Sequence, residues 1–218
     1  MNLMRTRTEI ETLLLDPGVV AVVRARSTEQ VPPLAEALVS NGVPAVEITM
    51  STPNALEAIR RARNEFGGRA LIGVGTVLTE DVCKAAVDAG AEFVVTPITR
   101  PSFVKIAHAA GVPIMLGAYT PTEAQSAHEA GSDFIKIFPA DGLGPGYVKS
   151  LRAPLPHLRI VPTGGVDLNT IAAFFKAGCA AVGVGSSLLT RAIMDHNDWK
   201  LLGELAAKYA AAARAAKG

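Results

Sequence analysis

Cysteine is scarce in this chain, and the pattern around it argues against a disulfide or a zinc site. Only Cys83 and Cys179 occur, the first in a helical pattern and the second at the start of a predicted strand. Neither has another cysteine or a histidine at ligand spacing, so we interpret both as core residues. The sequence predicts no metal site.

A surplus of charge of either sign is also missing. Twenty-one Lys and Arg residues against twenty Asp and Glu residues leave a net charge of +1. The chain therefore lacks the long-range positive field that nucleic-acid-binding proteins use to attract their partner. We expect a small-molecule ligand and no nucleic acid.

Long hydrophobic runs are absent as well. Apolar stretches such as residues 18–23 and 179–184 are far too short to span a bilayer. The first residues, MNLMRTRTEIETLLLDPG, lack the apolar core of a secretory leader. We expect no membrane partner and a cytoplasmic location.

The sequence does contain a regular alternation of short β-branched runs and amphipathic stretches, which is typical of repeated βα units around a parallel sheet. We predict strands at residues 19–24, 45–49, 70–74, 93–96, 114–116, 134–138, 159–162 and 181–185. Helical patterns lie near residues 28–41, 53–66, 79–90, 100–110, 121–130, 145–152 and 168–177. This count predicts an α/β protein with the (β/α)8 TIM-barrel fold.

No linker, charge block or low-complexity tract divides the chain, so we predict a single domain over residues 1–218. Residues 7–15 are predicted to form an extra helix that covers the bottom of the barrel. The Ala-rich residues 202–217 are predicted to form a helix packed outside it. Because catalytic groups in such barrels lie at the carboxyl ends of the strands, polar residues at those ends are the candidates for a site.

One lysine, Lys136, lies in the middle of an apolar strand, within the sequence DFIKIFP at residues 133–139. Alternation places it on the same face as Phe134 and Phe138. Burial favours the neutral amine, which is a nucleophile toward carbonyl groups. Lys136 is therefore a candidate for Schiff-base catalysis. The alternatives are an ion pair with Asp133 or a side chain that extends outward to solvent.

Glu47 occupies the same kind of position in the second predicted strand, where it shares a face with Ala45 and Thr49. An inward carboxylate that faces Lys136 across a barrel would serve as a general acid and base. The alternative is a buried ion pair with a purely structural role.

Two glycine-rich segments follow the last two strands. They read Pro-Thr-Gly-Gly-Val at residues 162–166 and Gly-Val-Gly-Ser-Ser at residues 183–187. Barrels commonly bind phosphate with the loops after strands seven and eight, so we predict a phosphorylated substrate held by Gly164, Gly165, Gly185 and Ser186. Taken singly, either segment would be interpreted as an ordinary tight turn.

Other strand ends carry weaker signals. Thr76, after Gly-Val-Gly at the third strand, could offer a hydroxyl to a carboxylate, although a simple turn is an equal alternative. Pro97 could shape the pocket after the fourth strand. Arg24 could contact an anion or form a surface salt bridge. The histidines have no partners nearby in sequence and are interpreted as solvated; they are His108, His128, His157 and His196.

Taken together, several motifs resemble the 2-keto-3-deoxy-6-phosphogluconate and 4-hydroxy-2-oxoglutarate aldolases, which are class I aldolases. The motifs are E-I-T-M, G-V-G-T-V-L, V-V-T-P, I-K-I-F-P, V-P-T-G-G-V and V-G-V-G-S-S, in order between about residues 19 and 189. The resemblance implies cleavage of the phosphogluconate substrate to pyruvate and D-glyceraldehyde 3-phosphate. It also implies cleavage of 4-hydroxy-2-oxoglutarate to pyruvate and glyoxylate, with no cofactor, in a homotrimer.

The resemblance also implies roles for single residues. Lys136 would form the carbinolamine and Schiff base with pyruvate, and Glu47 would shuttle protons through water. Thr76 would contact the pyruvyl carboxylate, Phe138 would line the pocket, and Thr163 would face the hydroxyl-bearing part of the substrate. The phosphate would be held by Gly164, Gly165, Gly185 and Ser186.

Ser51 departs from the resemblance, because many members of the family carry an arginine at this point. Arg24 could supply part of that charge. Residues 144–149 are also similar to the phosphogalactonate aldolases, whereas Thr163 favours the gluconate epimer. The sequence leaves three alternatives open: the galactonate substrate, a phosphosugar isomerase or epimerase in which Lys136 is only electrostatic, and a non-catalytic phosphate-binding barrel.

Overall fold

The runs of valine and isoleucine form a ring of parallel strands in the computed structural model, which describes residues 5–218. In this part of the chain the strands are β1 (Val19–Val23), β2 (Ala45–Thr49), β3 (Leu71–Gly75), β4 (Val94–Val95), β5 (Ile114–Ala118), β6 (Phe134–Ile137), β7 (Ile160–Pro162) and β8 (Val182–Val184). Their order is β7-β6-β5-β4-β3-β2-β1-β8, and a bridge between Thr163 and Gly183 joins the outer two. The TIM-barrel prediction is confirmed.

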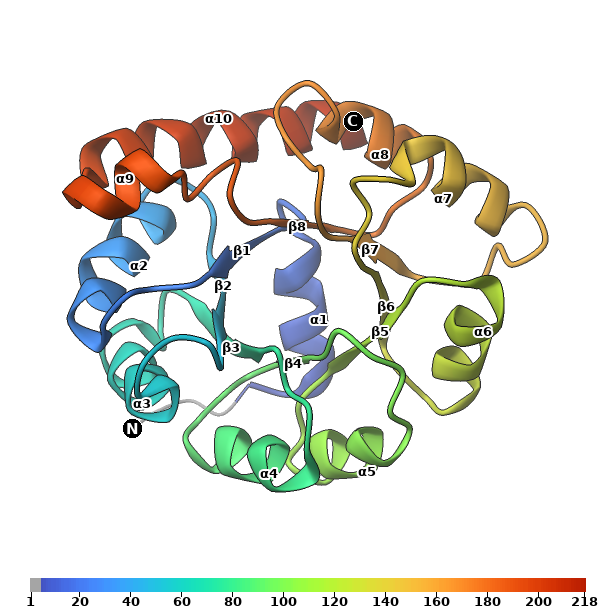
Figure 1. Cartoon of the computed structure of the whole chain (residues 1–218), viewed down its shortest axis with the longest axis horizontal. Coiled ribbons are helices and arrows are strands. Elements are labelled where there is room, and N and C mark those ends of the chain that lie inside the picture. Colours follow the sequence, from blue (N-terminus) through green and yellow to red (C-terminus); the bar gives the residue numbers. More distant parts are fainter. Residues whose placement is uncertain (1–4) are drawn as a thin grey trace.

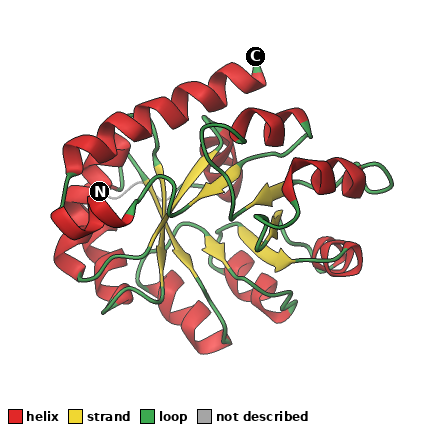
Figure 2. Ribbon diagram, turned by 45° about the horizontal axis from the view of Figure 1, so that its top comes forward, coloured by secondary structure: helices red, strands yellow, loops and turns green. Residues whose placement is uncertain are grey.

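Helices surround the ring, as Figures 1 and 2 show. They are α2 (Val31–Val39), α3 (Ala55–Phe66), α4 (Glu80–Asp88), α5 (Ser102–Ala109), α6 (Pro121–Glu129), α7 (Gly144–Arg152), α8 (Ile171–Lys176), α9 (Arg191–His196) and α10 (Trp199–Lys217). The long α10 lies outside the barrel against α8 and α2, as predicted for residues 202–217.

Two helical segments differ from the prediction. The pattern at residues 28–41 divides into a short 3-10 helix, η1 (Thr28–Gln30), and α2. Pro32 and Pro33 lie in the first turn of α2, where their missing N–H groups cost no hydrogen bond, so a new helix begins there. The sequence analysis did not predict α9, whose six residues are too few to show a helical period.

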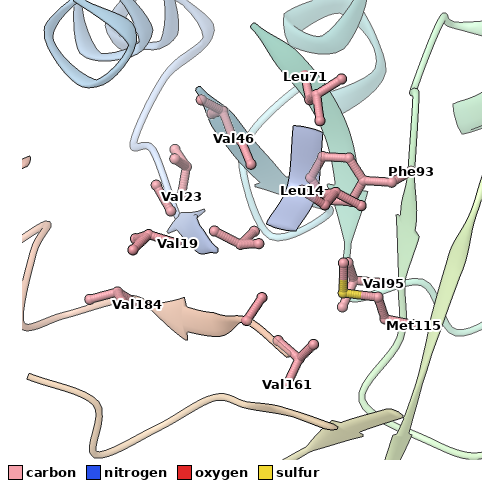
Figure 3. Packing of buried hydrophobic residues seen from close by; sticks show 14 of the residues in the cluster. Leu14, Val19, Val23, Val46, Leu71, Phe93, Val95, Met115, Val161 and Val184 are labelled. Atoms are coloured by element: carbon pink, nitrogen blue, oxygen red, sulfur yellow. The ribbon is translucent and has the colours of Figure 1, made fainter. Parts of the chain in front are cut away.

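The extra helix α1 (Arg7–Leu15) lies across the opening at the centre of the ring (Figure 1). Thr6 and Glu9 form a capping box at its start, and Ile10 and Leu14 are 1% exposed. Figure 3 shows the barrel core from close by, with Leu14 in the same buried cluster as Leu71 and Phe93. Because α1 ends just before β1 begins, it covers the amino ends of the strands and leaves their carboxyl ends open.

Both cysteines are buried and free, as the sequence predicts. Burial raises the pKa of the Cys83 thiol to about 11 and that of the Cys179 thiol to about 12. Neither is therefore a reactive thiolate at neutral pH. Within residues 5–218, no helix combines the length and the apolar character that a membrane crossing requires.

Candidate active site

Lys136 and Glu47 meet inside the barrel. Nζ of Lys136 lies 3.6 Å from Oε1 of Glu47, and the two residues are 5% and 2% exposed. They come from β6 and β2, which are not neighbouring strands, so their side chains approach one another across the interior. The ring centroid of Phe138 lies 5.2 Å from Nζ of Lys136. The geometry places a primary amine and a carboxylate together in an almost fully buried position.

Asp133 takes no part in this pair. Its Oδ2 is 2.9 Å from Nε2 of His108 and accepts a hydrogen bond from the backbone N–H of Ile114, while its Oδ1 lies 3.5 Å from Nε of Arg7. These partners lie near the amino ends of the strands, away from Lys136. The alternative interpretation of Lys136 as an ion-pair partner of Asp133 is wrong, and so is the interpretation of His108 as solvated. The other three histidines are exposed, as predicted.

A cavity of about 80 Å³ adjoins the pair at the carboxyl ends of β1, β6, β7 and β8. It is lined by Val22, Arg24, Phe138, Thr163, Gly164, Gly165, Val166, Gly183, Gly185, Ser186 and Ser187. Phe138 touches this cavity and also lies over Lys136, so the two regions are parts of one site. The cavity suits a compact polar group such as a phosphate.

The loop after β7 needs its two glycines. Gly164 and Gly165 have φ angles of +98° and +68°, in the region that strongly favours glycine. A Cβ on Gly165 would also lie 2.6 Å from Cα of Asp141. The backbone of this loop can therefore approach a bound group closely, with no side chain between them.

Arg24 follows β1 and lines the same cavity, with Nη1 3.7 Å from the place that a Cβ on Gly185 would occupy. Within residues 5–218 it forms no salt bridge, whereas Arg26, two residues further on, pairs with Asp195. The alternative of a surface salt bridge is therefore wrong for Arg24 among the described residues. Arg24 contributes an unneutralised positive charge to the cavity.

Thr76 and Pro97 lie at the ends of β3 and β4 and are half-buried. Thr76 has a φ angle of +60°, which is strained for a β-branched residue. A residue is held in such a conformation only when its surroundings fix it, and such strain clusters at functional sites. Pro97 packs so closely over Gly117 that a Cβ there would lie 2.2 Å from the carbonyl carbon of Pro97.

Ser51 is exposed just after β2, and its Oγ lies 2.7 Å from Oγ1 of Thr49. Thr49 donates its one hydroxyl proton to the carbonyl oxygen of Val23, at 3.0 Å. Ser51 must therefore donate its own proton to Thr49, which leaves only lone pairs free on Ser51. At this point the site offers a hydrogen-bond acceptor and no positive charge.

The sequence analysis did not name Val22, Val166, Gly183 or Ser187 as site residues, although all four line the cavity. Val22 could have been found from strand alternation, which places it on the same face as Arg24. Val166, Gly183 and Ser187 lie within the two glycine-rich segments, residues 162–166 and 183–187, beside the residues predicted to bind phosphate. Among the described residues, no group of three or more His, Cys, Asp or Glu side chains is arranged to hold a metal ion.

Comparisons with known proteins agree with this architecture. A family model described as "KDPG and KHG aldolase" matches residues 10–205. The chain is 35% identical to a 2-dehydro-3-deoxy-phosphogluconate aldolase of Pseudomonas aeruginosa, over 91% of this chain and 90% of the relative. It is also 35% identical to the 2-dehydro-3-deoxy-6-phosphogalactonate aldolase of Escherichia coli, over 78% of this chain and 83% of the relative.

Two solved structures are similar as well. One, described as a native KDPGal structure, has a TM-score of 0.85 and 32% identity and covers 91% of this chain and 95% of its own. The other is a KDPG aldolase from Legionella pneumophila with pyruvate captured as a covalent carbinolamine intermediate. It has a TM-score of 0.83 and 28% identity and covers 90% of this chain and 96% of its own.

The fold and these relatives define the protein as a TIM-barrel aldolase, a carbon–carbon lyase. Within that class, the chain belongs to the KDPG and KHG aldolase family. The resemblance inferred from the motifs is confirmed at the level of the family.

Proposed function

We propose that this aldolase cleaves 2-dehydro-3-deoxy-6-phosphogluconate to pyruvate and D-glyceraldehyde 3-phosphate through a Schiff base on Lys136. The observation that carries the proposal is the pair of Lys136 and Glu47, 3.6 Å apart and almost fully buried. A buried amine beside a carboxylate supplies both a nucleophile for the keto group and a group that moves protons. 4-Hydroxy-2-oxoglutarate, which would give pyruvate and glyoxylate, is a second substrate of the same chemistry.

The reaction begins when the Glu47 carboxylate takes a proton from Nζ of Lys136, and the neutral amine attacks the C2 carbonyl carbon. One proton then passes from nitrogen to the C2 oxygen, which gives the carbinolamine. Protonated Glu47 returns its proton to the carbinolamine hydroxyl, which leaves as water, and an iminium ion remains. The C4 hydroxyl then gives its proton to the Glu47 carboxylate, directly or through water, and the C3–C4 bond breaks. C4 departs as an aldehyde while the bonding electrons pass into an enamine.

Glu47 then returns the proton to C3 of the enamine, which restores the iminium ion. Addition of water to C2 releases pyruvate and the free amine of Lys136. The nitrogen of Lys136 is the electron sink throughout, so the proposed chemistry requires no cofactor.

The other candidate residues surround the two ends of the substrate. The proposal assigns the pyruvyl end to Thr76 and Pro97, and the hydroxyl-bearing middle to Thr163. Phe138 forms the apolar side of the pocket beside Lys136. The phosphate is assigned to the glycine loops and Arg24, because backbone N–H groups and an unpaired guanidinium are the donors that favour an anion. The phosphate ligands are Gly164, Gly165, Gly185 and Ser186.

Borohydride in the presence of pyruvate tests the covalent step. We expect irreversible inactivation and a mass increase confined to the peptide that contains Lys136, with no labelling of a Lys136→Ala protein. Glu47→Gln, which keeps the shape of the side chain, should lower kcat at least about a hundredfold in an assay that couples pyruvate to lactate dehydrogenase. An active, folded protein with no label on Lys136 would favour the isomerase or epimerase alternative.

The galactonate epimer is a second candidate, favoured by the similarity to the E. coli phosphogalactonate aldolase. The two substrates differ only in the configuration of one hydroxyl group, so Thr163 and its neighbours would decide between them. Steady-state rates with both epimers and with 4-hydroxy-2-oxoglutarate, measured side by side on one preparation, rank the three substrates.

Three broader expectations also remain proposals. A single domain is supported by one buried cluster that extends from Ile10 to Ala213; residues 1–4 of the predicted 1–218 lie outside the described residues. A homotrimer rests on the family resemblance and is tested by light scattering after size exclusion. A cytoplasmic location is tested by cell fractionation.

A further inference from the structure

Gly75, the last residue of β3, lies directly beside the Glu47 side chain. A Cβ built on Gly75 would lie 1.9 Å from Oε1 of Glu47 and 2.6 Å from both its Cδ and its Cγ. The φ angle of Gly75 lies outside the positive region that favours glycine, so its backbone could accept a side chain. The obstacle to a side chain at this position is therefore the Glu47 side chain and not the backbone conformation of Gly75.

Hydrogen bonds do not hold the Glu47 side chain in place. In the part of the chain that the structure describes, its buried Oε1 has no hydrogen-bond partner, and the 3.6 Å contact with Lys136 is longer than a direct hydrogen bond. A carboxylate fixed by several N–H donors would keep its position if a neighbour changed. Here the shape of the surrounding barrel has to fix it.

The register of the strands explains how Gly75 reaches the carboxylate. Gly73 pairs with Glu47, and Gly75 pairs with Thr49, two residues further toward the carboxyl end. The Glu47 side chain leans in that direction, as strand side chains do, and so lies over Gly75. The two glycines differ in what they accommodate, because a Cβ on Gly73 would meet the ring of Phe93, at 2.4 Å.

We propose that Gly75 is a positioning residue: because it has no side chain, the carboxylate of Glu47 can occupy the space beside it and so lie next to Lys136. This inference rests on the proposed role of Glu47 in moving protons. Any side chain at position 75 forces the carboxylate away from the amine, while Lys136, on the other side of the barrel, stays where it is.

Gly75→Ala tests the proposal. We expect kcat for aldol cleavage to fall about a hundredfold, because the added methyl group pushes the Glu47 carboxylate away from the reacting atoms. KM should change little. The colliding atoms belong to the movable end of a side chain, so Tm should fall by only a few degrees. Gly68→Ala is the matched control, since a Cβ on Gly68 meets nothing within 4 Å.

Two further measurements separate positioning from general damage. Borohydride trapping of pyruvate on Lys136, taken to its end point, should remain complete in Gly75→Ala. Exchange of the methyl hydrogens of pyruvate with solvent deuterium requires proton transfer between Glu47 and C3 of the enamine. This exchange should slow about as much as kcat. Loss of trapping in a folded Gly75→Ala protein would overturn the proposal, because Lys136 would then be displaced as well.

A double-mutant cycle with Glu47→Ala completes the test. Without the Glu47 carboxylate there is nothing for the added methyl group to displace, so the fall in Tm caused by Gly75→Ala should disappear in the Glu47→Ala protein. Unfolding of Gly75→Ala only when Glu47 is present would support the proposal, and unfolding in both backgrounds would overturn it. A kcat of Gly75→Ala that lies within about twofold of the kcat of the unmodified protein would also overturn the proposal. If Glu47→Ala alone keeps full turnover, the role proposed for Glu47 fails instead.

Discussion

Lys136 and Glu47 approach to 3.6 Å across the interior of the barrel, although their strands β6 and β2 share no hydrogen bonds. Hydrogen bonds hold neighbouring strands at a fixed spacing. Residues on opposite sides of the barrel meet only if no bulky side chain lies between them. Gly75 supplies the necessary space on the side of Glu47, because a Cβ on Gly75 would lie 1.9 Å from Oε1 of Glu47. The pair therefore depends on a neighbour that itself takes no part in the chemistry.

Arg24→Gln should raise the KM for the phosphorylated substrate about tenfold, because a charge-assisted hydrogen bond to the phosphate is lost. The KM for 4-hydroxy-2-oxoglutarate, which carries no phosphate, should change much less. Arg26→Gln is the control, since Arg26 pairs with Asp195 outside the cavity. Steady-state kinetics of both variants with both substrates provide the measurement, and equal effects on the two substrates would contradict the assignment.

Thr76→Gly should stabilise the fold while it lowers activity. Relief of the strain at a φ of +60° contributes about 1–2 kcal/mol, from which the extra freedom of glycine in the unfolded chain subtracts about 0.5–1 kcal/mol. We expect a net gain of roughly 0.5–1 kcal/mol in the free energy of unfolding, measured by urea denaturation. Thr76→Ser, which keeps the hydroxyl and most of the strain, should retain activity and gain no stability. A less stable Thr76→Gly protein would show that the strain argument is wrong.

Ser51→Arg should improve the use of dicarboxylate substrates. Ser51 offers only lone pairs, because its proton is directed to Thr49. A guanidinium in its place would add a positive charge at the mouth of the site and should lower the KM for 4-hydroxy-2-oxoglutarate about tenfold. Ser51→Gln provides a long, uncharged control. If both variants change KM equally, length and not charge is responsible.

Acid should destabilise the start of α6 through Glu123. Hydrogen bonds from the backbone of Tyr119 and from the side chain and backbone of Thr120 hold the pKa of Glu123 below its usual value of 4.5. A carboxyl group whose pKa is lowered by folding stabilises the protein fully at a pH above its pKa in the unfolded chain. This stabilisation is lost as the pH falls through the pKa of the group in the folded protein. The difference in unfolding free energy between the unmodified protein and Glu123→Gln should therefore shrink from about pH 6 to about pH 3. A difference that stays constant over this range would exclude this role, and Glu129→Gln on the same helix serves as the control.

The barrel was predictable because its strands repeat a local pattern. The valines of β1 and β8 and the isoleucines of β6 mark buried strands, and the turns between them carry glycines at helix ends. Errors arose where local signals are short. Only Val94 and Val95 remain of the fourth predicted strand, and the six-residue α9 was not predicted. The partner of His108 is Asp133, twenty-five residues away in the chain, and could not be found from neighbouring residues.

The sequence by itself determined the family and the barrel. It also determined the strand faces on which Lys136 and Glu47 lie, and the position of the two glycine loops after the last two strands. Alternation and spacing are local properties of a chain, and they are sufficient for those conclusions. Only the tertiary structure decided that Lys136 pairs with Glu47 and not with Asp133, that Arg24 is unpaired, and that Gly75 leaves room for the Glu47 carboxylate. The physical reason is that closing the ring sets the distances between side chains of strands far apart in the chain, and no local pattern contains those distances.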